Sequence, residues 1–503
     1  MQTILYPFFK VFLVIKVNRL VNATQRTILF LIADTGAGHR SAANAINNAI
    51  TLLSKQQQQE WQTRIEAQSA MVDGVGAQKT LQATTVVPQT PTPPTYRTQI
   101  VDVFEEYSRF PLREAVKLYG PTIRYNPKLY GEFFKQSNRD SAIVAVKTIA
   151  TPLIFNGLLR LITSVQPDVI VSIHPMLNHI TVQVLRELRL NIPFITVVTD
   201  LVSIHHAWFT PGVDRYVVPT EQAKQLYLQR GLDPEHVSML GMPIDPKYTV
   251  PVDSKVELQR KFNLKPGIPT ILLVGGGDGA GGLQKAVRAI SRAHLPVQLM
   301  VVTGRNRRLY THLQRTRSSL HVPAKIFGFV QNMPELMHAS DVIITKAGPG
   351  TICEALACNL PVVLSGYVPG QEEGNIDFVV KNEVGVLALE PPTLIDALRR
   401  LIRPGSPELR RQQANAKRIS RPRSSFDIAE CILSYLPTVD KPSVWQSQNW
   451  QVRRQTMSSR LKSAIRIRRL RRRLPRTIMK SPMMRRLTSL RIRGFGEDDK
   501  DIQ

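Results

Sequence analysis

The segment 348–375 holds polar residues whose types and spacing suit a nucleotide diphosphate. Gly348 and Gly350 lie between a short apolar stretch that predicts a buried strand and a run, 351–358, that predicts a helix. Glycine lets a ligand approach the backbone closely, and the N–H groups at a helix N-terminus attract phosphate. Glu354 lies about one turn into this helix, where a diphosphate would repel it, so its natural partner is a neutral diol such as a ribose.

More polar side chains follow the next predicted strand, after a Val-Pro-Gly turn at 368–370. Doubly wound sheets bind ligands beyond the carboxyl ends of their strands, so these side chains should meet the same ligand as Glu354. A plain strand–turn–helix unit with an exposed glutamate is the alternative, but it would not require Gln-Glu-Glu-Gly-Asn at this spacing. We therefore expect a nucleotide site formed by Gly348, Gly350, Thr351, Glu354, Gln371, Glu372 and Asn375.

This segment resembles the UDP-sugar-binding signature of the glycosyltransferases that include bacterial MurG and the monogalactosyldiacylglycerol synthases of plants and bacteria. It is more similar to the galactolipid synthases. The resemblance implies that Glu354 holds the ribose of a UDP-sugar donor and that Gln371 and Glu372 contact its hexose. It spans roughly residues 27–436 apart from an insertion, and it implies two doubly wound Rossmann-like α/β domains facing a cleft, the GT-B architecture.

The first predicted strand leads into the loop Asp-Thr-Gly-Ala-Gly-His-Arg at 34–40. It resembles the DTGGGHR loop of the galactolipid synthases, with Ala37 in place of one glycine. His39 is a candidate general base for an acceptor hydroxyl, and Asp34 either orients it or is the base itself. A histidine that only bonds the backbone is the alternative.

The run Thr-Asp-Leu-Val-Ser-Ile-His-His-Ala-Trp-Phe at 199–209 ends another buried strand. It resembles the TDL…HPTWF segment of the same family, with His206 in place of the proline and Ala207 in place of the threonine. A further Ser-Ile-His-Pro run resembles the family's SxHP. The residues that we expect on the acceptor side are His174, Asp200, His205 and Trp208. Trp208 can equally belong to the core, and the histidines lack a carboxylate-rich surrounding sequence, so we expect no bound metal and no cofactor.

A G-x-G-x-x-G pattern at Gly277, Gly279 and Gly282 raises an NAD-dependent oxidoreductase as a rival. Such enzymes place an acidic residue about 20 residues further on. Here the next Asp or Glu after Asp278 is Glu335, which counts against this alternative. The loop is similar to the GGGDGxG of the galactolipid synthases, where it approaches the donor diphosphate, so Gly277 and Gly279 are assigned to donor binding.

The chain has 503 residues and 43% hydrophobic content, which allows two or three units plus tails. Alternating strand and helix patterns predict an acceptor-binding domain at 25–250 and a UDP-sugar-binding domain at 251–437. In the family that the chain resembles, the last helix returns to the first domain. Residues 55–98 combine a glutamine run with a Thr/Pro-rich stretch, which predicts a disordered insertion. Three cysteines are too few for a disulfide scaffold and fit a reduced compartment.

The two ends of the chain differ from these domains. Residues 1–24 are apolar but interrupted by Pro7, Lys10 and Lys16, which favours a segment lying on a bilayer, with an ordinary strand or helix as the alternative. In the basic amphipathic tail 438–503, residues 441–503 hold 18 Lys and Arg against 4 Asp and Glu, a net +14 of the chain's +28. Its arginines alternate with aliphatic residues, so an anionic membrane surface is a better partner than nucleic acid.

Together these features predict a peripheral, inverting glycosyltransferase on the cytoplasmic face of a membrane. It would move a hexose from a UDP-hexose to 1,2-diacylglycerol and form a β-glycolipid, with galactose favoured and glucose as the alternative. A MurG-like transferase with a polyprenyl-linked acceptor and a nucleic-acid-binding protein that uses the tail are the other classes. Aromatic residues between 107 and 134 and the aliphatic tail favour diacylglycerol, and no RNA-binding motif is present.

Overall fold

The computed structural model contains two α/β domains within one compact unit, residues 1–440, and a second unit at 441–503. The described residues are 25–34, 37–74, 92–118, 122, 126–275, 282–438 and 443–446. The N-terminal segment 1–24 and most of the tail lie outside the described residues. Expectations about those two segments therefore stay predictions.

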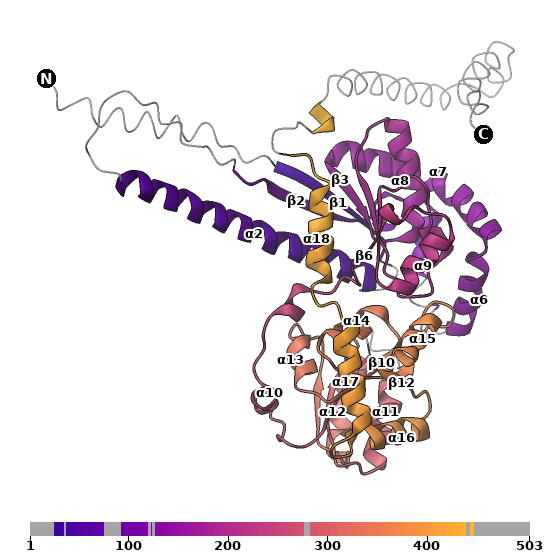
Figure 1. Cartoon of the computed structure of the whole chain (residues 1–503). Coiled ribbons are helices and arrows are strands. Elements are labelled where there is room, and N and C mark those ends of the chain that lie inside the picture. Colours follow the sequence, from indigo (N-terminus) through magenta and orange to yellow (C-terminus); the bar gives the residue numbers. More distant parts are fainter. Residues whose placement is uncertain are drawn as a thin grey trace, which may run out of the picture. The chain divides into compact units, whose positions relative to one another are not determined.

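Six parallel strands form the sheet of the first domain (Figure 1). In spatial order they are β2 (Thr95–Asp102), β1 (Gln25–Ile32), β3 (Val169–Ser172), β4 (Phe194–Val197), β5 (Arg215–Val218) and β6 (Val237–Met239). Parallel strands are covered on both faces, so β3 and β4 are continuous buried runs. The chain leaves β1 for β2 on one side and enters β3 on the other. The switch point, where such sheets bind ligands, therefore lies beyond β1 and β3.

Helices connect these strands and cover the sheet. In chain order they are α2 (Ala37–Gly74), α3 (Val103–Tyr107), α4 (Leu112–Lys117), α6 (Pro127–Ser137), α7 (Asp140–Val165), α8 (Pro175–Leu188) and α9 (Glu221–Gln229). The side chains of Ile46 and Ile50 on α2 join Ile28 and Phe30 of β1 in one buried core. This core fixes the start of α2, where the predicted base His39 lies.

The second domain repeats the plan with six parallel strands. In spatial order they are β12 (Gly385–Leu387), β11 (Val362–Gly366), β10 (Val342–Lys346), β7 (Thr270–Val274), β8 (Gln298–Val302) and β9 (Ala324–Phe327). Its helices are α10 (Lys255–Lys261), α11 (Leu283–Arg292), α12 (Arg307–Thr316), α13 (Met333–His338), α14 (Pro349–Ala357), α15 (Glu373–Lys381), α16 (Pro391–Ile402) and α17 (Pro407–Ile419). Its switch point lies between β7 and β10, where α14 begins. The predicted α/β architecture of two doubly wound domains, the GT-B arrangement, is confirmed.

The last helix of this unit, α18 (Ser424–Ser434), packs on the first domain after α17 has packed on the second (Figure 1). Ile428 and Ile432 belong to the core under β1 and β3. The Ser425 hydroxyl donates to the Ile244 carbonyl at 2.6 Å, which ties the start of α18 to the end of the first domain. The chain therefore crosses between the domains twice, as the resemblance implies.

Between β1 and β2 the structure differs from the predicted disordered insertion. α2 continues to Gly74 and β2 begins at Thr95, so residues 55–74 are helical. Gln, Glu and Ala are good helix formers, and residues 55–60 are exposed. The Tyr96 hydroxyl donates to Oε1 of Gln57 at 3.4 Å and joins the helix to β2. In residues 55–74 a low apolar content therefore marks an exposed helix and not disorder, while residues 75–91 of the predicted insertion lie outside the described residues.

Candidate active site

The turn after β10 is a candidate phosphate site, and we call residues 346–351 the phosphate turn. Gly348 precedes α14, and no described side chain caps the N-terminus of this helix. A side chain at Gly350 would meet nothing within 4 Å, so the start of the helix has room beside it for a ligand. Thr351, half-buried, lies in the first turn of the helix. Uncapped N–H groups with open space beside them are what anion binding at a helix N-terminus requires.

An ion pair that the sequence analysis did not identify lies at this turn. The Lys346 ammonium group donates to one carboxylate oxygen of Glu372, and the Val368 N–H donates to the other at 2.8 Å. The Glu372 side chain is only 6% exposed, so the carboxylate is shielded from water, while the Lys346 side chain is 28% exposed. A Cβ on Gly348 would lie 3.4 Å from the Lys346 nitrogen. A positive charge is thus held at the opening of α14; its only sequence signal is a lysine that ends an apolar strand.

The predicted hexose contacts lie in the segment 368–375, which we call the donor loop. Glu372 uses both carboxylate oxygens to hold the loop, as described above. Asn375 is buried and donates from Nδ2 to the Ala347 carbonyl at 2.8 Å, so it joins the donor loop to the phosphate turn. Gln371 is half-buried, and its Oε1 accepts a hydrogen bond from the Tyr130 hydroxyl at 2.9 Å. The described contacts of these residues therefore shape the loop, and contact with a hexose stays a prediction.

Glu354 lies half-buried on α14, where the Tyr248 hydroxyl donates to its carboxylate. Burial raises the pKa of Glu354 to about 7, although Lys247 and the bond from Tyr248 act in the opposite direction. Tyr248 is buried in a short 3₁₀ helix, Pro246–Thr249, that the sequence analysis did not single out. A ribose at this carboxylate would have to share or replace the bond from Tyr248.

His39 and His174 meet edge to face beyond the ends of β1 and β3, with ring centroids 4.9 Å apart. The Thr199 hydroxyl lies 3.2 Å from Nδ1 of His39, and the ring also hydrogen-bonds the Ile173 backbone. Burial lowers the pKa of His39 to about 4 and the pKa of His174 well below its usual value. Both rings are therefore neutral at neutral pH, which is the form that a general base needs.

Asp34 is paired with Arg40, so the side chain that orients His39 is Thr199 and not Asp34. Nε of Arg40 donates to Oδ2 of Asp34 at 2.7 Å, and both side chains are exposed. The Asp34 N–H donates to the Asp102 carboxylate at 2.8 Å. Asp34 therefore acts on His39 through the field of its charge, which raises the pKa of His39 slightly against the larger effect of burial.

The segment 199–209, which we call the acceptor segment, positions a second carboxylate. Trp208 is fully buried, so its core interpretation holds, and its Nε1 donates to Oδ2 of Asp200 at 2.8 Å. Burial raises the pKa of Asp200 to about 6. His205 is buried with Nε2 3.4 Å from the Ser137 hydroxyl, and burial lowers its pKa to about 4. The chain thus brings two candidate bases, His39 and Asp200, to the carboxyl ends of β1 and β4, the two strands that flank β3.

The donor loop and the acceptor segment are in direct contact. The Gly374 N–H donates to the Ser203 hydroxyl at 3.1 Å, and any Cβ on Gly374 would collide with that oxygen. A hexose on the donor loop would therefore lie beside the acceptor segment, which is the proximity that group transfer needs.

Gly277 and Gly279 lie outside the described residues, as do residues 35 and 36 of the loop before His39.

Comparison with known proteins gives this geometry a family. A family model described as "Monogalactosyldiacylglycerol (MGDG) synthase" matches residues 77–244, and one described as "Glycosyltransferase family 28 C-terminal domain" matches residues 270–425. The chain is 34% identical to a protein named probable monogalactosyldiacylglycerol synthase 2, chloroplastic, from Oryza sativa subsp. japonica, over 82% of this chain and 81% of that protein.

It is also 32% identical to monogalactosyldiacylglycerol synthase 3, chloroplastic, from Arabidopsis thaliana, over 81% of each chain. The chain belongs to the monogalactosyldiacylglycerol synthase family. The resemblance that the donor loop and the DTGAGHR loop predict is therefore confirmed. The first matched range of this chain contains the acceptor segment, and the second contains the donor loop.

Solved structures with a related arrangement include MurG from Acinetobacter baumannii, at 12% identity over 81% of this chain and 99% of that chain, with a TM-score of 0.48. Another is MnaA from S. aureus with UDP, at 16% identity over 83% of this chain and 99% of that chain, with a TM-score of 0.48. The assignment of the chain to the monogalactosyldiacylglycerol synthase family rests on the sequence relatives and the family models.

Proposed function

We propose that this protein transfers galactose from UDP-galactose to the hydroxyl of 1,2-diacylglycerol, with inversion, to form a β-galactolipid. The observation that carries the proposal is the contact between Gly374 of the donor loop and Ser203 of the acceptor segment. It supports a sugar site on the donor loop that adjoins the acceptor segment, which carries Asp200 and whose Thr199 hydroxyl lies 3.2 Å from His39. Family membership supports galactose and diacylglycerol over a polyprenyl-linked acceptor or a nucleic acid.

The leaving UDP needs positive charge around its diphosphate. The uncapped start of α14 supplies N–H groups and the positive end of a helix dipole. Lys346, held by Glu372 beside Gly348, adds an ammonium group whose charge the Glu372 carboxylate partly balances. We propose that these groups stabilise UDP without a bound metal or cofactor, and that transfer persists in the presence of a chelator.

The acceptor hydroxyl needs a base on the opposite side of the reacting carbon. Its oxygen forms a bond to C1 of galactose as the C1–O bond to UDP breaks, and its proton passes to the base. His39 fits this role because it is neutral and fixed by Thr199 and the Ile173 backbone. Asp200 is the second candidate, since Trp208 fixes its carboxylate.

A cavity with both apolar and polar lining borders the acceptor segment and is a candidate entry for the lipid acceptor. Its volume is about 340 Å³, and it opens between α6, the acceptor segment and Gly370 of the donor loop. Its lining combines apolar with polar side chains: Phe134, Val202, Ile204, Phe209 and Leu226 on the one hand, and Lys135, Asn138, Ser203, His206, Arg230 and Glu373 on the other. We propose that the glycerol end of diacylglycerol enters here, with its acyl chains still in the membrane.

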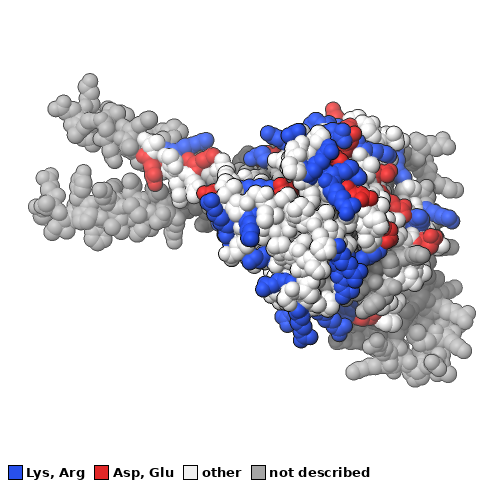
Figure 2. Space-filling view, turned by 90° about the horizontal axis from the view of Figure 1, so that it is seen from below, with Lys and Arg blue, Asp and Glu red and all other residues white. Residues whose placement is uncertain are grey.

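Binding to the surface of a membrane is consistent with the exposed side chains. Phe110 is 80% exposed, and Leu118 and Leu129 are more than half exposed; the first two lie between β2 and α6, and Leu129 lies on α6. Figure 2 shows Lys and Arg side chains spread over one face, with acidic ones among them. Within the described residues, every helix is too short or too polar to cross a bilayer. We propose peripheral attachment to an anionic membrane surface.

The direct test supplies radiolabelled UDP-galactose or UDP-glucose with diacylglycerol in liposomes and identifies the lipid product. We expect a β-galactosyl lipid from UDP-galactose and little product from UDP-glucose. Glucose transfer at a comparable rate would correct the sugar, and transfer only to a polyprenyl-linked sugar would replace the acceptor. No transfer to any lipid would contradict the proposal.

A further inference from the structure

Helix α6 contacts the donor loop with its first turns. The Tyr130 hydroxyl donates to Oε1 of Gln371 at 2.9 Å, although 241 residues separate them. Tyr130 is 7% exposed, so this bond is shielded from water. Oxygen-to-oxygen hydrogen bonds in such surroundings hold side-chain amides in one orientation. Tyr130, a residue of the other domain, thus contributes to the orientation of the Gln371 side chain.

The backbones of α6 and the donor loop pack closely beside this hydrogen bond. A Cβ on Gly131 would lie 2.8 Å from Cβ of Pro369, closer than side chains normally approach. Gly370 has a φ of +77°, and a Cβ there would lie 3.2 Å from both the Gly131 carbonyl and the Phe134 ring. Glycine is required on both sides of the contact. The close approach of α6 to the donor loop is therefore fixed by the packing of the two backbones. The hydrogen bond between Tyr130 and Gln371 does not depend on a flexible surface side chain.

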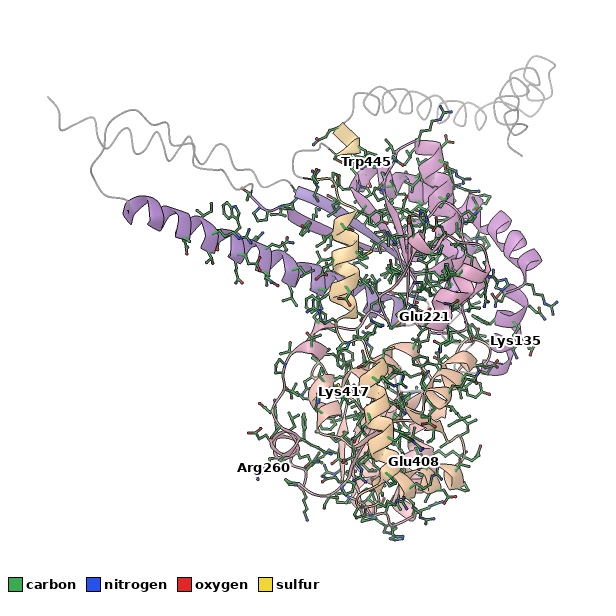
Figure 3. The ribbon with its side chains drawn as sticks, in the orientation of Figure 1. Lys135, Glu221, Arg260, Glu408, Lys417 and Trp445 are labelled. Carbon is green, nitrogen blue, oxygen red and sulfur yellow. The ribbon has the colours of Figure 1, made fainter. Side chains whose placement is uncertain are left out.

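A weaker ion pair extends the same contact. Lys135, which lies on α6 (Figure 3), approaches the Glu373 carboxylate at 3.7 Å, and the same carboxylate accepts the Gly370 N–H at 3.0 Å. Both side chains are about half exposed, so the pair contributes little by itself. Its position still adds to the evidence that one face of α6 is complementary to the donor loop.

The last turn of α6 contacts the acceptor segment. The Phe134 ring packs edge to face on His205 with centroids 5.2 Å apart, and the Ser137 hydroxyl lies 3.4 Å from its Nε2. Asn138, just after the helix, accepts the His206 N–H through Oδ1 at 2.6 Å. One short helix therefore bridges the segment that carries Gln371 and the segment that carries the acceptor-side histidines.

We propose that Tyr130 is a positioning residue for the donor hexose: its hydroxyl fixes the side chain of Gln371, and α6 thereby joins the sugar site to the acceptor segment. This inference rests on the proposed function, in which Gln371 contacts the hexose. Because the effect passes through Gln371, it concerns the sugar and not the nucleotide. Loss of the hydroxyl should therefore weaken recognition of UDP-galactose while UDP binds as before.

The test is Tyr130→Phe, which removes only the hydroxyl. We expect kcat/KM for UDP-galactose to fall by about tenfold, as for one lost buried hydrogen bond. The affinity for UDP should match that of the wild type, and the melting temperature should fall by only a few degrees, the effect of one lost hydrogen bond. Tyr96→Phe is the matched control, because Tyr96 also donates to a glutamine Oε1, that of Gln57, on an exposed part of the first domain. This control should keep wild-type kinetics.

A double-mutant cycle separates positioning from packing. If Tyr130 acts through Gln371, the variant that combines Tyr130→Phe with Gln371→Ala loses no more activity than Gln371→Ala alone. Additive losses would overturn the inference, and so would a fall in UDP affinity and melting temperature in parallel with activity. Wild-type kinetics in Tyr130→Phe, alongside normal galactose transfer by the wild type, would overturn it while the proposed function stands. A wild-type protein that transfers no galactose would overturn the proposed function itself.

Discussion

Lys346 and Glu372 form a partly shielded ion pair beside Gly348, and this pair joins the phosphate turn to the donor loop. The Glu372 carboxylate therefore stabilises the donor loop even when no ligand is bound. The same pair holds the Lys346 ammonium group beside the N-terminus of α14. One pair thus couples the shape of the sugar-binding loop to the charge that a diphosphate would need.

Lys346→Met should destabilise the protein, because it leaves Glu372 buried without its cation, a change that typically costs about 3 kcal/mol or more. It should also weaken UDP binding by about tenfold through the lost charge. Thermal unfolding and calorimetry with UDP measure the two effects. Adding Glu372→Gln should restore much of the stability but not the UDP affinity. Lys255→Met removes a comparable lysine, paired with Asp341 before β10, and should leave UDP affinity unchanged.

Glu354→Ala should weaken binding of UDP and UDP-galactose by about 1–3 kcal/mol, the usual range for hydrogen bonds to a charged group. Tyr248→Phe is a useful companion, because it removes the bond that Tyr248 donates to this carboxylate and should leave the ribose contact intact. Unchanged UDP affinity in Glu354→Ala, measured by calorimetry, would remove Glu354 from the ribose site.

The raised pKa of Glu354, about 7, gives UDP binding a pH dependence. Ribose hydroxyls donate to the carboxylate, so affinity should increase as pH rises through about 7 and the group loses its proton. The contribution of Glu354 to stability has the opposite sign: its folded pKa is above the ordinary value, so this contribution is present at low pH and is lost as pH rises through about 7. Both dependences should disappear in Glu354→Gln, measured by calorimetry and by thermal unfolding between pH 5.5 and 8.5, a range of about 1.5 units on either side.

Local patterns predicted the parts of the site that depend on one segment of chain. The glycines of the phosphate turn and the apolar run before them were sufficient to place β10, α14 and Glu354. Contacts such as Tyr130 with Gln371 join residues 241 positions apart, and nothing in either segment alone specifies them. The strands β6 and β12 were not predicted, because each has three residues and too little periodicity to detect.

A pH–rate profile should identify the base, because the two candidates have different pKa values. A general base works only when deprotonated, so the rate falls as pH drops through its pKa. With His39 as the base the fall comes near pH 4, and with Asp200 it comes near pH 6. His39→Ala should cut turnover by about 10²-fold or more with UDP affinity intact. Asp34→Asn should cost less than that, because Asp34 is exposed and bound to Arg40.

A fall near pH 6 that vanishes in Asp200→Asn, with His39→Ala close to wild type, would assign the base to Asp200. Trp208→Phe would then lower activity as well, since it removes the N–H that fixes Asp200. If neither variant lowers turnover, the base lies elsewhere in the acceptor segment or beyond it, and His205 becomes the next candidate.

The basic tail predicts how the protein is held at a membrane, and the structure shows where to cut it. Sequence alone placed the boundary at residue 437, but the Thr438 carbonyl accepts a hydrogen bond from the buried Arg26 at 2.6 Å. Truncation after Asp440, where the first unit ends, keeps this bond. The truncated protein should fold and bind UDP normally but bind anionic vesicles poorly, because half of the net charge of +28 is gone.

Binding of the full chain should fall steeply with salt, because the Debye length shrinks from about 10 Å at 0.1 M to about 3 Å at 1 M. The aliphatic residues of the tail should leave a salt-resistant remainder. Co-sedimentation of both forms with vesicles across a salt series measures this. Equal sedimentation of the two forms would assign docking to residues 1–24 or to the exposed Phe110 and Leu118 instead. Tight, salt-sensitive binding of the tail to DNA but not to vesicles would make nucleic acid its partner.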